Sequence, residues 1–220
     1  MMSRTNESDG CGPVVAGTRV VADPSTTAVL CVECQNGMLG PDAVLPALAA
    51  EARGIVGNIE RLVAAARSVG VPVVHATFEG FVVGGEPGPE RLWRASKASR
   101  QWHPGHPATQ VIAELLDPGD LVLPRHHGLS PTGGTELLAV LRSMGIRTVI
   151  LAGVSVNVAI LLTAADASQD GFRVLVARDA VAGVPAAYTE EVLRNTVAMF
   201  ADLTTVDAVT AAWTESVVQA

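Results

Sequence analysis

Short apolar segments alternate along the chain with longer segments in which apolar residues recur at helical spacing. The short segments are predicted to be strands, at residues 28–33, 71–77, 120–123, 147–152, 173–177 and 203–206. The longer ones are predicted to be helices, at residues 45–69, 108–116, 135–144, 156–169, 189–200 and 208–216. Several strands are continuous apolar runs, which is typical of a parallel sheet covered on both faces. The pattern predicts an α/β fold, a three-layer αβα sandwich with a mostly parallel six-stranded doubly wound sheet.

Composition narrows the class of protein. The chain has 220 residues, of which 49% are hydrophobic and 17% charged, so we expect one domain at 26–220 after a flexible N-terminal arm at 1–25. A net charge of −7 with no basic stretch argues against a nucleic-acid partner. Since no apolar run reaches the roughly 18 residues of a membrane span, and residues 1–12 lack the apolar core of a signal peptide, we expect a cytoplasmic protein that does not bind membranes.

A long connection at residues 79–107 interrupts the regular alternation. It is rich in Gly and Pro and carries Trp93 and Trp102. Loops of this length in compact domains usually have a function, so we expect a lid over the site or a partner contact. His103 and His106 in this loop form a poor set of metal ligands, and we expect neither a metal nor a cofactor.

Two cysteines form a C-x-x-C pattern inside the first predicted strand. Three strand steps would separate the Cα atoms of Cys31 and Cys34 by roughly 10 Å, too far for a disulfide. We therefore expect small buried hydrophobic side chains.

Polar residues follow the first and third predicted strands, where ligands bind in open parallel sheets. Glu33 ends the first strand, and a carboxylate there is costly unless it is paired or functional. It is either a salt-bridged or capping residue or a general acid or base. Arg125 after the third strand could pair with Glu33 and clamp an anionic substrate. His126 or His127 could shuttle protons, or both could face solvent.

The fourth strand ends in a Gly turn that opens a helix, at residues 153–159. Backbone N–H groups and the positive end of a helix dipole converge at such a turn. A Cys one turn into the helix would be a reactive thiolate, but Ala159 stands there. Ser155 could cap the helix or act as a nucleophile, although no G-x-S-x-G pattern supports the second role. Asn157 could face a ligand or cap backbone groups.

The chain resembles the isochorismatase-like hydrolases, also called the cysteine hydrolase superfamily. The resemblance covers residues 26–206 and is strongest at 28–36, 134–141, 145–167 and 171–182. It implies an Asp-Lys-Cys triad whose positions hold Glu33, then Arg125 or His126, then Ala159. Counting from flanking residues does not decide between Arg125 and His126. Cys34 does not compensate, because strand alternation points it away from the side used by Glu33.

The resemblance also implies further properties. The family often has a non-proline cis peptide at the turn corresponding to Val154–Ser155, and its members usually form dimers or tetramers. Isochorismatases also lack the Cys and are acid catalysts that cleave a vinyl ether, a role open to Glu33.

Three functions follow as hypotheses. The first is an enzyme that acts on a small carbonyl, carboxylate or enol-ether metabolite by non-covalent acid/base catalysis, with Glu33, Arg125 and His126 as its catalytic residues. The predicted substrate-binding residues are Gln35, His127, Ser130, Ser155, Asn157, Ala159, Trp93 and Trp102. Thr135 is expected to cap a helix. The second hypothesis is a catalytically inactive binding protein that kept the pocket, and the third is a Ser155-dependent acyl hydrolase.

Overall fold

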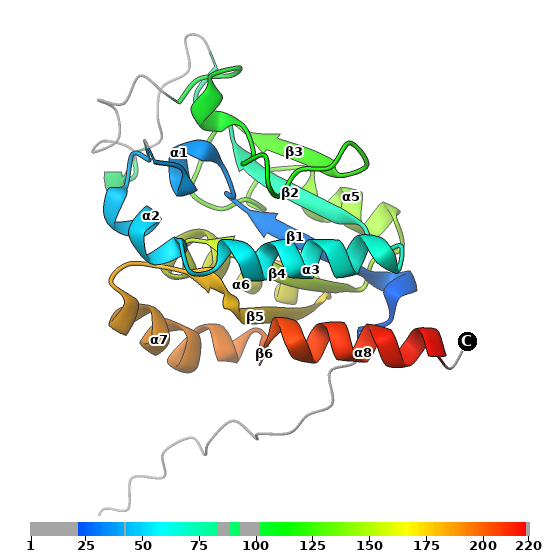
Figure 1. Ribbon diagram of the computed structural model, residues 1–220. Helices are drawn as coiled ribbons and strands as arrows, with labels where there is room; N and C mark the ends of the chain where they lie inside the picture. The colour runs from blue at the N-terminus through cyan, green and yellow to red at the C-terminus, as the bar shows by residue number, and fades with distance from the viewer. Residues whose placement is uncertain (1–21, 42, 83–88, 93–101, 219–220) are drawn as a thin grey trace, which may run out of the picture.

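A six-stranded sheet forms the middle of the molecule in a computed structural model, which describes residues 22–41, 43–82, 89–92 and 102–218 (Figure 1). The strands are β1 Thr27–Val32, β2 Val73–Phe78, β3 Leu121–Arg125, β4 Thr148–Val154, β5 Arg173–Ala182 and β6 Asp202–Thr204. They lie in the order β3-β2-β1-β4-β5-β6, and every neighbouring pair is parallel. The predicted fold class is therefore confirmed. Most of the predicted N-terminal arm lies outside the described residues.

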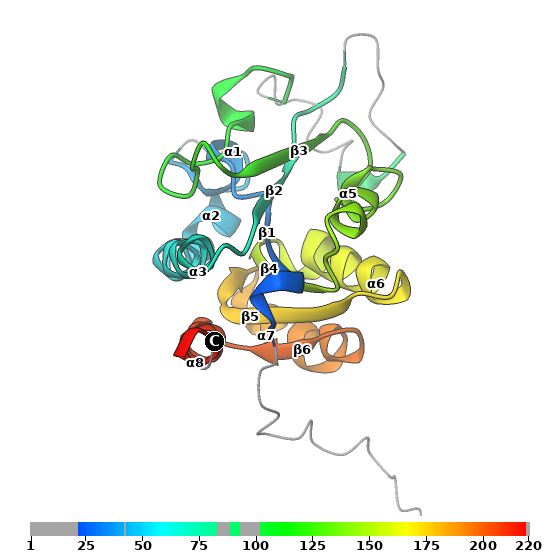
Figure 2. The same cartoon turned by 90° about the vertical axis from the view of Figure 1, so that its right-hand side faces the viewer.

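Helices cover both faces of the sheet (Figure 2). On one face lie α2 Pro46–Ala52, α3 Val56–Ser68 and α8 Val206–Val218. On the other lie α5 Leu137–Ser143, α6 Leu161–Gln169 and α7 Ala186–Asn195. Alternate residues of β1 enter the two hydrophobic clusters, Val29 and Cys31 on the first face and Leu30 and Val32 on the second. This double burial explains the continuous apolar runs in the sequence.

The predicted helix at 108–116 is wrong. Only a short 3₁₀ helix, η2 Pro107–Thr109, forms there. The following backbone pairs instead with the chain after β1: the Asn36 N–H donates to the Gln110 carbonyl at 2.9 Å, and the Ile112 N–H donates to the Cys34 carbonyl at 3.0 Å. These long-range bonds satisfy groups that a helix would have paired locally, so tertiary contacts override the local pattern.

Other helices differ from prediction in their bounds. The segment predicted as one helix at 45–69 divides into α2 and α3 around a turn that contains Gly54, a residue of low helix propensity. A short helix, α1 Asn36–Leu39, was not predicted, since four residues are too few to show a period. Within the described residues, no helix combines the length and hydrophobicity needed to cross a membrane.

The strand order places the carboxyl ends of β1 and β4 side by side. From β1 the chain builds outward through β2 and β3, and then returns to add β4, β5 and β6 on the other side. Such a reversal leaves a crevice outside the carboxyl ends of the two central strands, where ligands bind in open α/β sheets.

Candidate active site

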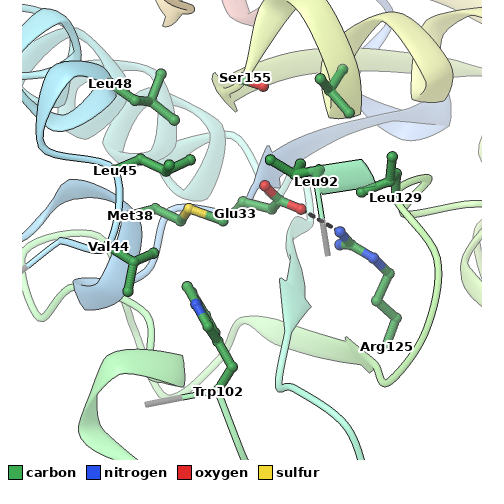
Figure 3. Close-up of a pocket in the computed structure, with 11 residues that line it drawn as sticks. Glu33, Met38, Val44, Leu45, Leu48, Leu92, Trp102, Arg125, Leu129 and Ser155 are labelled. Carbon is green, nitrogen blue, oxygen red and sulfur yellow. Dashed lines mark hydrogen bonds and ion pairs between the residues drawn. The ribbon is translucent and has the colours of Figure 1, made fainter. Parts of the chain in front are cut away.

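A cavity of about 40 Å³ lies at this edge of the sheet, and Glu33, Arg125 and Ser155 supply its polar wall (Figure 3). One water needs roughly 10–15 Å³ of such space, so the cavity has room for a small ligand. The remaining wall is apolar and consists of Met38, Val44, Leu45, Leu48, Leu92, Trp102, Leu129 and Val158.

Glu33 follows β1 directly and leaves the strand conformation. Its φ is 51°, a left-handed value uncommon for a residue with a side chain. Its N–H still donates to the Ala76 carbonyl of β2 at 2.9 Å, and its carbonyl accepts from the Gln35 N–H at 2.9 Å. This tight turn ends the strand alternation and presents the carboxylate to the cavity. Only 6% of the residue is exposed. Strained backbone of this kind is concentrated at functional sites.

Arg125 is the last residue of β3 and reaches Glu33 across the end of β2. Its Cα partner in the sheet is Phe78, and its guanidinium carbon lies 5.1 Å from the centre of the Phe78 ring. The Nη2 group donates a hydrogen bond to Glu33 Oε1. Arg125 is 4% exposed, and its Nε and Nη1 groups are buried without a hydrogen-bond partner among the described residues. The site therefore contains a buried ion pair with two unused donors.

Gln35 supports this arrangement from behind. Its side-chain amide donates to the Phe78 carbonyl at 2.9 Å and the Thr109 carbonyl at 2.5 Å, while its Oε1 accepts from the Phe78 N–H at 2.9 Å. The residue is fully buried and does not line the cavity. Gln35, expected to bind substrate, instead fixes the backbone that carries the ring beneath Arg125.

The two histidines that follow Arg125 lie elsewhere. Nδ1 of His126 is hydrogen-bonded to the Gly80 carbonyl at 3.0 Å. His126 and His127 line a second cavity of about 300 Å³ beside Thr135 and Leu137. Of the two candidates for the cation position, the structure brings Arg125 to Glu33 and turns His126 away.

Ser130 does not reach the cavity. Its hydroxyl donates to Asp166 Oδ2 at 2.8 Å and accepts from the N–H groups of Thr132 and Gly133 at 3.2 and 3.1 Å. These bonds attach the loop to α6. Thr135, expected to cap a helix, lies one residue before the N-cap of α5, which is Glu136. Its Oγ1 donates to the Pro131 carbonyl at 2.7 Å and accepts a long bond from the Leu137 N–H at 3.4 Å.

The chain after β4 carries the expected cis peptide at Val154–Ser155. It continues into η3 Val156–Ile160, a π-helical turn that leads into α6. Ser155 lines the cavity, but Asn157 does not, because its Oδ1 is buried near Gly183 without a partner among the described residues. Ala159 is 1% exposed and packs in the hydrophobic cluster beneath α6. Asn157 and Ala159, both expected to bind substrate, thus do not line the cavity.

The described cysteines offer no replacement nucleophile. Cys31 and Cys34 are buried in the cluster under α2 and α3, and neither lines the cavity. A hydrogen bond with Cys31, together with burial, raises the pKa of the Cys34 thiol well above its ordinary value. Cys34 therefore stays a thiol near neutral pH and is a weak nucleophile.

The long loop contributes one wall of the cavity. Trp102 is buried and packs against Phe78, with ring centroids 5.6 Å apart. Gly80 fits tightly beneath it, since a Cβ there would come within 2.1 Å of the Trp102 carbonyl oxygen. Trp93 lies outside the described residues. The aliphatic lining residues were not predicted, because side chains from α1, α2, η3 and the connecting loops show no common sequence signal.

His103 and His106 form a ring contact in the long loop. Their ring centroids are 5.1 Å apart, and His106 Nδ1 accepts from the Ala108 N–H at 3.1 Å. In the described part of the chain, no three His, Cys, Asp or Glu side chains are grouped so that they could hold a metal ion.

A buried polar cluster fixes the start of β3, away from the cavity. Asp120 accepts a two-pronged bond from Arg67, at 3.1 and 2.5 Å, and lies 3.0 Å from His75 Nε2. Burial opposes ionisation of Asp120, but the bonds from Arg67, His75 and the Asp117 backbone outweigh it and lower the pKa of Asp120. Burial lowers the pKa of His75 and outweighs its pairing with Asp120. His75 is thus neutral beside a charged carboxylate.

The isochorismatase domain matches residues 27–208 of the chain. The chain belongs to the isochorismatase family. A ureidoacrylate amidohydrolase of Methylobacterium radiotolerans is 30% identical over 181 residues, which cover 73% of this chain and 69% of that protein. A maleamate amidohydrolase of Pseudomonas putida is 32% identical over 164 residues, which cover 70% and 71%. The relatives are named as hydrolases, so this isochorismatase-family protein is an enzyme of a hydrolytic family.

Solved structures of the isochorismatase family and its relatives share the fold. A cysteine hydrolase from Pseudomonas syringae pv. phaseolicola superimposes with a TM-score of 0.78 at 24% identity, covering 92% of this chain and all of that one. An N-carbamoylsarcosine amidase from Thermoplasma acidophilum gives a TM-score of 0.68 at 27% identity, covering 83% and 97%. The family's hydrolytic fold is thus kept around a cavity in which no described cysteine is exposed.

Proposed function

We propose that the protein hydrolyses a small carbonyl, carboxylate or enol-ether metabolite by non-covalent acid/base catalysis, with Glu33 as the proton-transferring group. The observation that carries this proposal is the buried ion pair of Glu33 and Arg125 in the wall of the cavity. Burying two charges costs free energy unless they are paired and used. Membership of a family of hydrolases supports the choice of reaction.

The carboxylate of Glu33 supplies the proton transfers. For a carbonyl substrate, it takes a proton from the attacking water and returns that proton to the leaving group. For an enol ether, the protonated acid gives its proton to carbon, water adds to the resulting cation, and the carboxylate recovers a proton from that water. Both sequences use one side chain and leave it unchanged at the end of the cycle.

Arg125 stabilises the charges that arise during this cycle. Its Nη2 bond keeps the carboxylate in place, while Nε and Nη1 have no described partner and remain available for an oxygen of the substrate. Fixed donors aimed at a developing negative charge are worth more in a water-poor cavity than in solution.

Covalent catalysis by sulfur has no support in the described residues. The resemblance implies that Ala159 stands at the position of the family's cysteine, and both described cysteines are buried and do not line the cavity. Ser155 is the second candidate for the catalytic residue, here as a nucleophile, because it lines the same cavity as Glu33 (Figure 3). In that case Glu33 would activate the serine, and an acyl-enzyme would form.

Mass spectrometry of the intact protein separates the two mechanisms. A panel of small amides, ureido compounds and enol ethers identifies a turned-over substrate, and the reaction is then quenched with acid during steady state. Acid/base catalysis predicts no mass increase on the enzyme and full turnover by Ser155→Ala. An acyl adduct that disappears in Ser155→Ala, together with loss of turnover, would support the serine mechanism instead.

The protein is also proposed to form a homo-oligomer. Family resemblance predicts a homodimer or homotetramer, and sedimentation of the full chain measures this directly. A monomer at micromolar concentration would contradict it.

A further inference from the structure

The cavity wall is almost entirely hydrocarbon. Glu33, Arg125 and Ser155 are its three polar residues, and the other eight lining residues are apolar. Figure 3 shows the side chains of Met38, Leu45 and Leu48 on one side of the Glu33 carboxylate and that of Leu129 near Arg125. A ligand in this cavity is surrounded mainly by carbon, which favours apolar groups.

The charges of the wall already cancel. Among the described residues that line the cavity, Arg125 is the one cation and Glu33 the one anion, and they are bonded to each other. A substrate carboxylate would add a second negative charge beside Glu33, and no other described lining residue is a cation that could balance it. Burying an uncompensated charge in apolar surroundings is strongly unfavourable.

The two unpaired N–H donors of Arg125 need a hydrogen-bond acceptor, and this acceptor does not have to be charged. Nε and Nη1 are buried and have no hydrogen-bond partner among the described residues, and the side chain as a whole is only 2% exposed. A carbonyl or ether oxygen accepts from such donors and leaves the charge balance of the cavity unchanged.

We infer that the cavity selects an uncharged, mainly apolar small molecule with one hydrogen-bonding oxygen next to Arg125, and that it disfavours carboxylates. This narrows the substrate class of the proposed function and rests on the same site. The selection of uncharged ligands comes from charge balance. Because the charges of Glu33 and Arg125 cancel, a neutral ligand leaves the cavity without net charge.

Isosteric pairs of probes test this selection directly. Butyramide and butyrate have the same heavy-atom skeleton and differ in charge, as do benzamide and benzoate. Dissociation constants come from NMR titrations of ¹⁵N-labelled full-length protein, in which the indole N–H of Trp102 reports on the cavity. For the wild type we expect each amide to bind at least about tenfold more tightly than its carboxylate, because the carboxylate carries a charge that the cavity cannot balance.

A change of cavity charge should reverse the preference. Glu33→Gln keeps the shape of the side chain but frees the charge of Arg125, so each carboxylate should gain at least about tenfold in affinity while its amide changes little. Leu129→Arg, which adds a cation to the wall, should give the same gain, and Leu129→Met is the neutral control of similar size.

The outcomes decide the inference either way. Equal or tighter binding of the carboxylates by the wild type would overturn it, and so would failure of both members of each pair to bind. Because binding is measured without turnover, the inference can survive a failure of the proposed function. If the wild type prefers the amides while Glu33→Gln retains full catalytic activity, acid/base catalysis is rejected and charge selection stands.

Discussion

The guanidinium of Arg125 crosses the end of β2 to donate a hydrogen bond to the carboxylate of Glu33. The two residues follow or end strands that are not neighbours, and the ring of Phe78 on the intervening strand lies under the crossing. Both side chains are almost completely buried. The fold therefore places a buried carboxylate and its counter-ion together at the carboxyl edge of the sheet, beside the ends of β1 and β4.

Removing one partner of this pair should destabilise the protein strongly. Arg125→Gln leaves Glu33 buried without its cation, and we expect the free energy of unfolding to fall by about 3–5 kcal/mol. In the double variant Glu33→Gln with Arg125→Gln, much of this loss should be recovered because no unpaired charge remains. Urea denaturation of the four proteins gives the coupling energy. Simple additivity of the two single changes would show that the ion pair is absent in solution.

Gln35 should matter for both stability and activity. Gln35→Leu leaves the Phe78 N–H and carbonyl and the Thr109 carbonyl without their partner, and an unsatisfied buried group costs about 1–3 kcal/mol. Since Phe78 carries the ring under Arg125, turnover should fall as well. Asn36→Ala is the matched control, because it removes one bond to the Pro107 carbonyl at a more exposed position. Equal effects of the two substitutions on unfolding and turnover would contradict the supporting role of Gln35.

The sheet could be predicted from sequence because its strands are buried on both faces. Continuous apolar runs such as Val149–Leu151 leave little choice of structure, and the strand at each predicted position is present. The helix predicted at 108–116 failed because the backbone of this segment forms hydrogen bonds with Cys34 and Asn36, which no local pattern reveals.

The candidate site could be predicted only in part. Glu33 was found because a carboxylate at the end of an apolar strand is unusual, and Arg125 because it follows a strand on the same edge. The sequence could not decide whether Arg125 or His126 pairs with Glu33, because the answer depends on which way each side chain points at the end of β3. Ser130 and Gln35 were expected to bind substrate but form hydrogen bonds within the protein instead. The sequence shows these polar side chains but not the groups of the folded protein that pair with them.

Stability should fall as the pH is lowered through the ordinary pKa of histidine. Because burial holds the pKa of His75 below that value, the unfolded chain binds a proton near pH 6 that the folded protein does not. Asp120, whose pKa is lowered, keeps its contribution until the pH falls below the ordinary range of an aspartate. Urea denaturation between pH 5 and 7.5 should therefore show a smaller pH dependence for His75→Gln than for the wild type. An unchanged dependence would mean that His75 protonates freely in the folded protein.

Thiol reagents should leave the enzyme active. Cys31 and Cys34 are buried, and the raised pKa of Cys34 keeps that side chain in its unreactive form. Treatment of the folded protein with iodoacetamide should modify neither residue, as peptide mass spectrometry can show, and turnover should be unchanged. The same treatment in urea is the control and should modify both. Loss of turnover in step with modification of Cys31 or Cys34 would restore a role for sulfur.

Turnover by Glu33→Gln, beside Ser155→Ala, tests the central claim most directly. The glutamine keeps the size of the side chain and removes its ability to exchange a proton, so kcat/KM should fall by roughly 10²–10⁴-fold, while Ser155→Ala stays near the wild-type rate. Circular dichroism and unfolding curves confirm that both variants are folded. Wild-type turnover by folded Glu33→Gln would contradict proton transfer by this carboxylate.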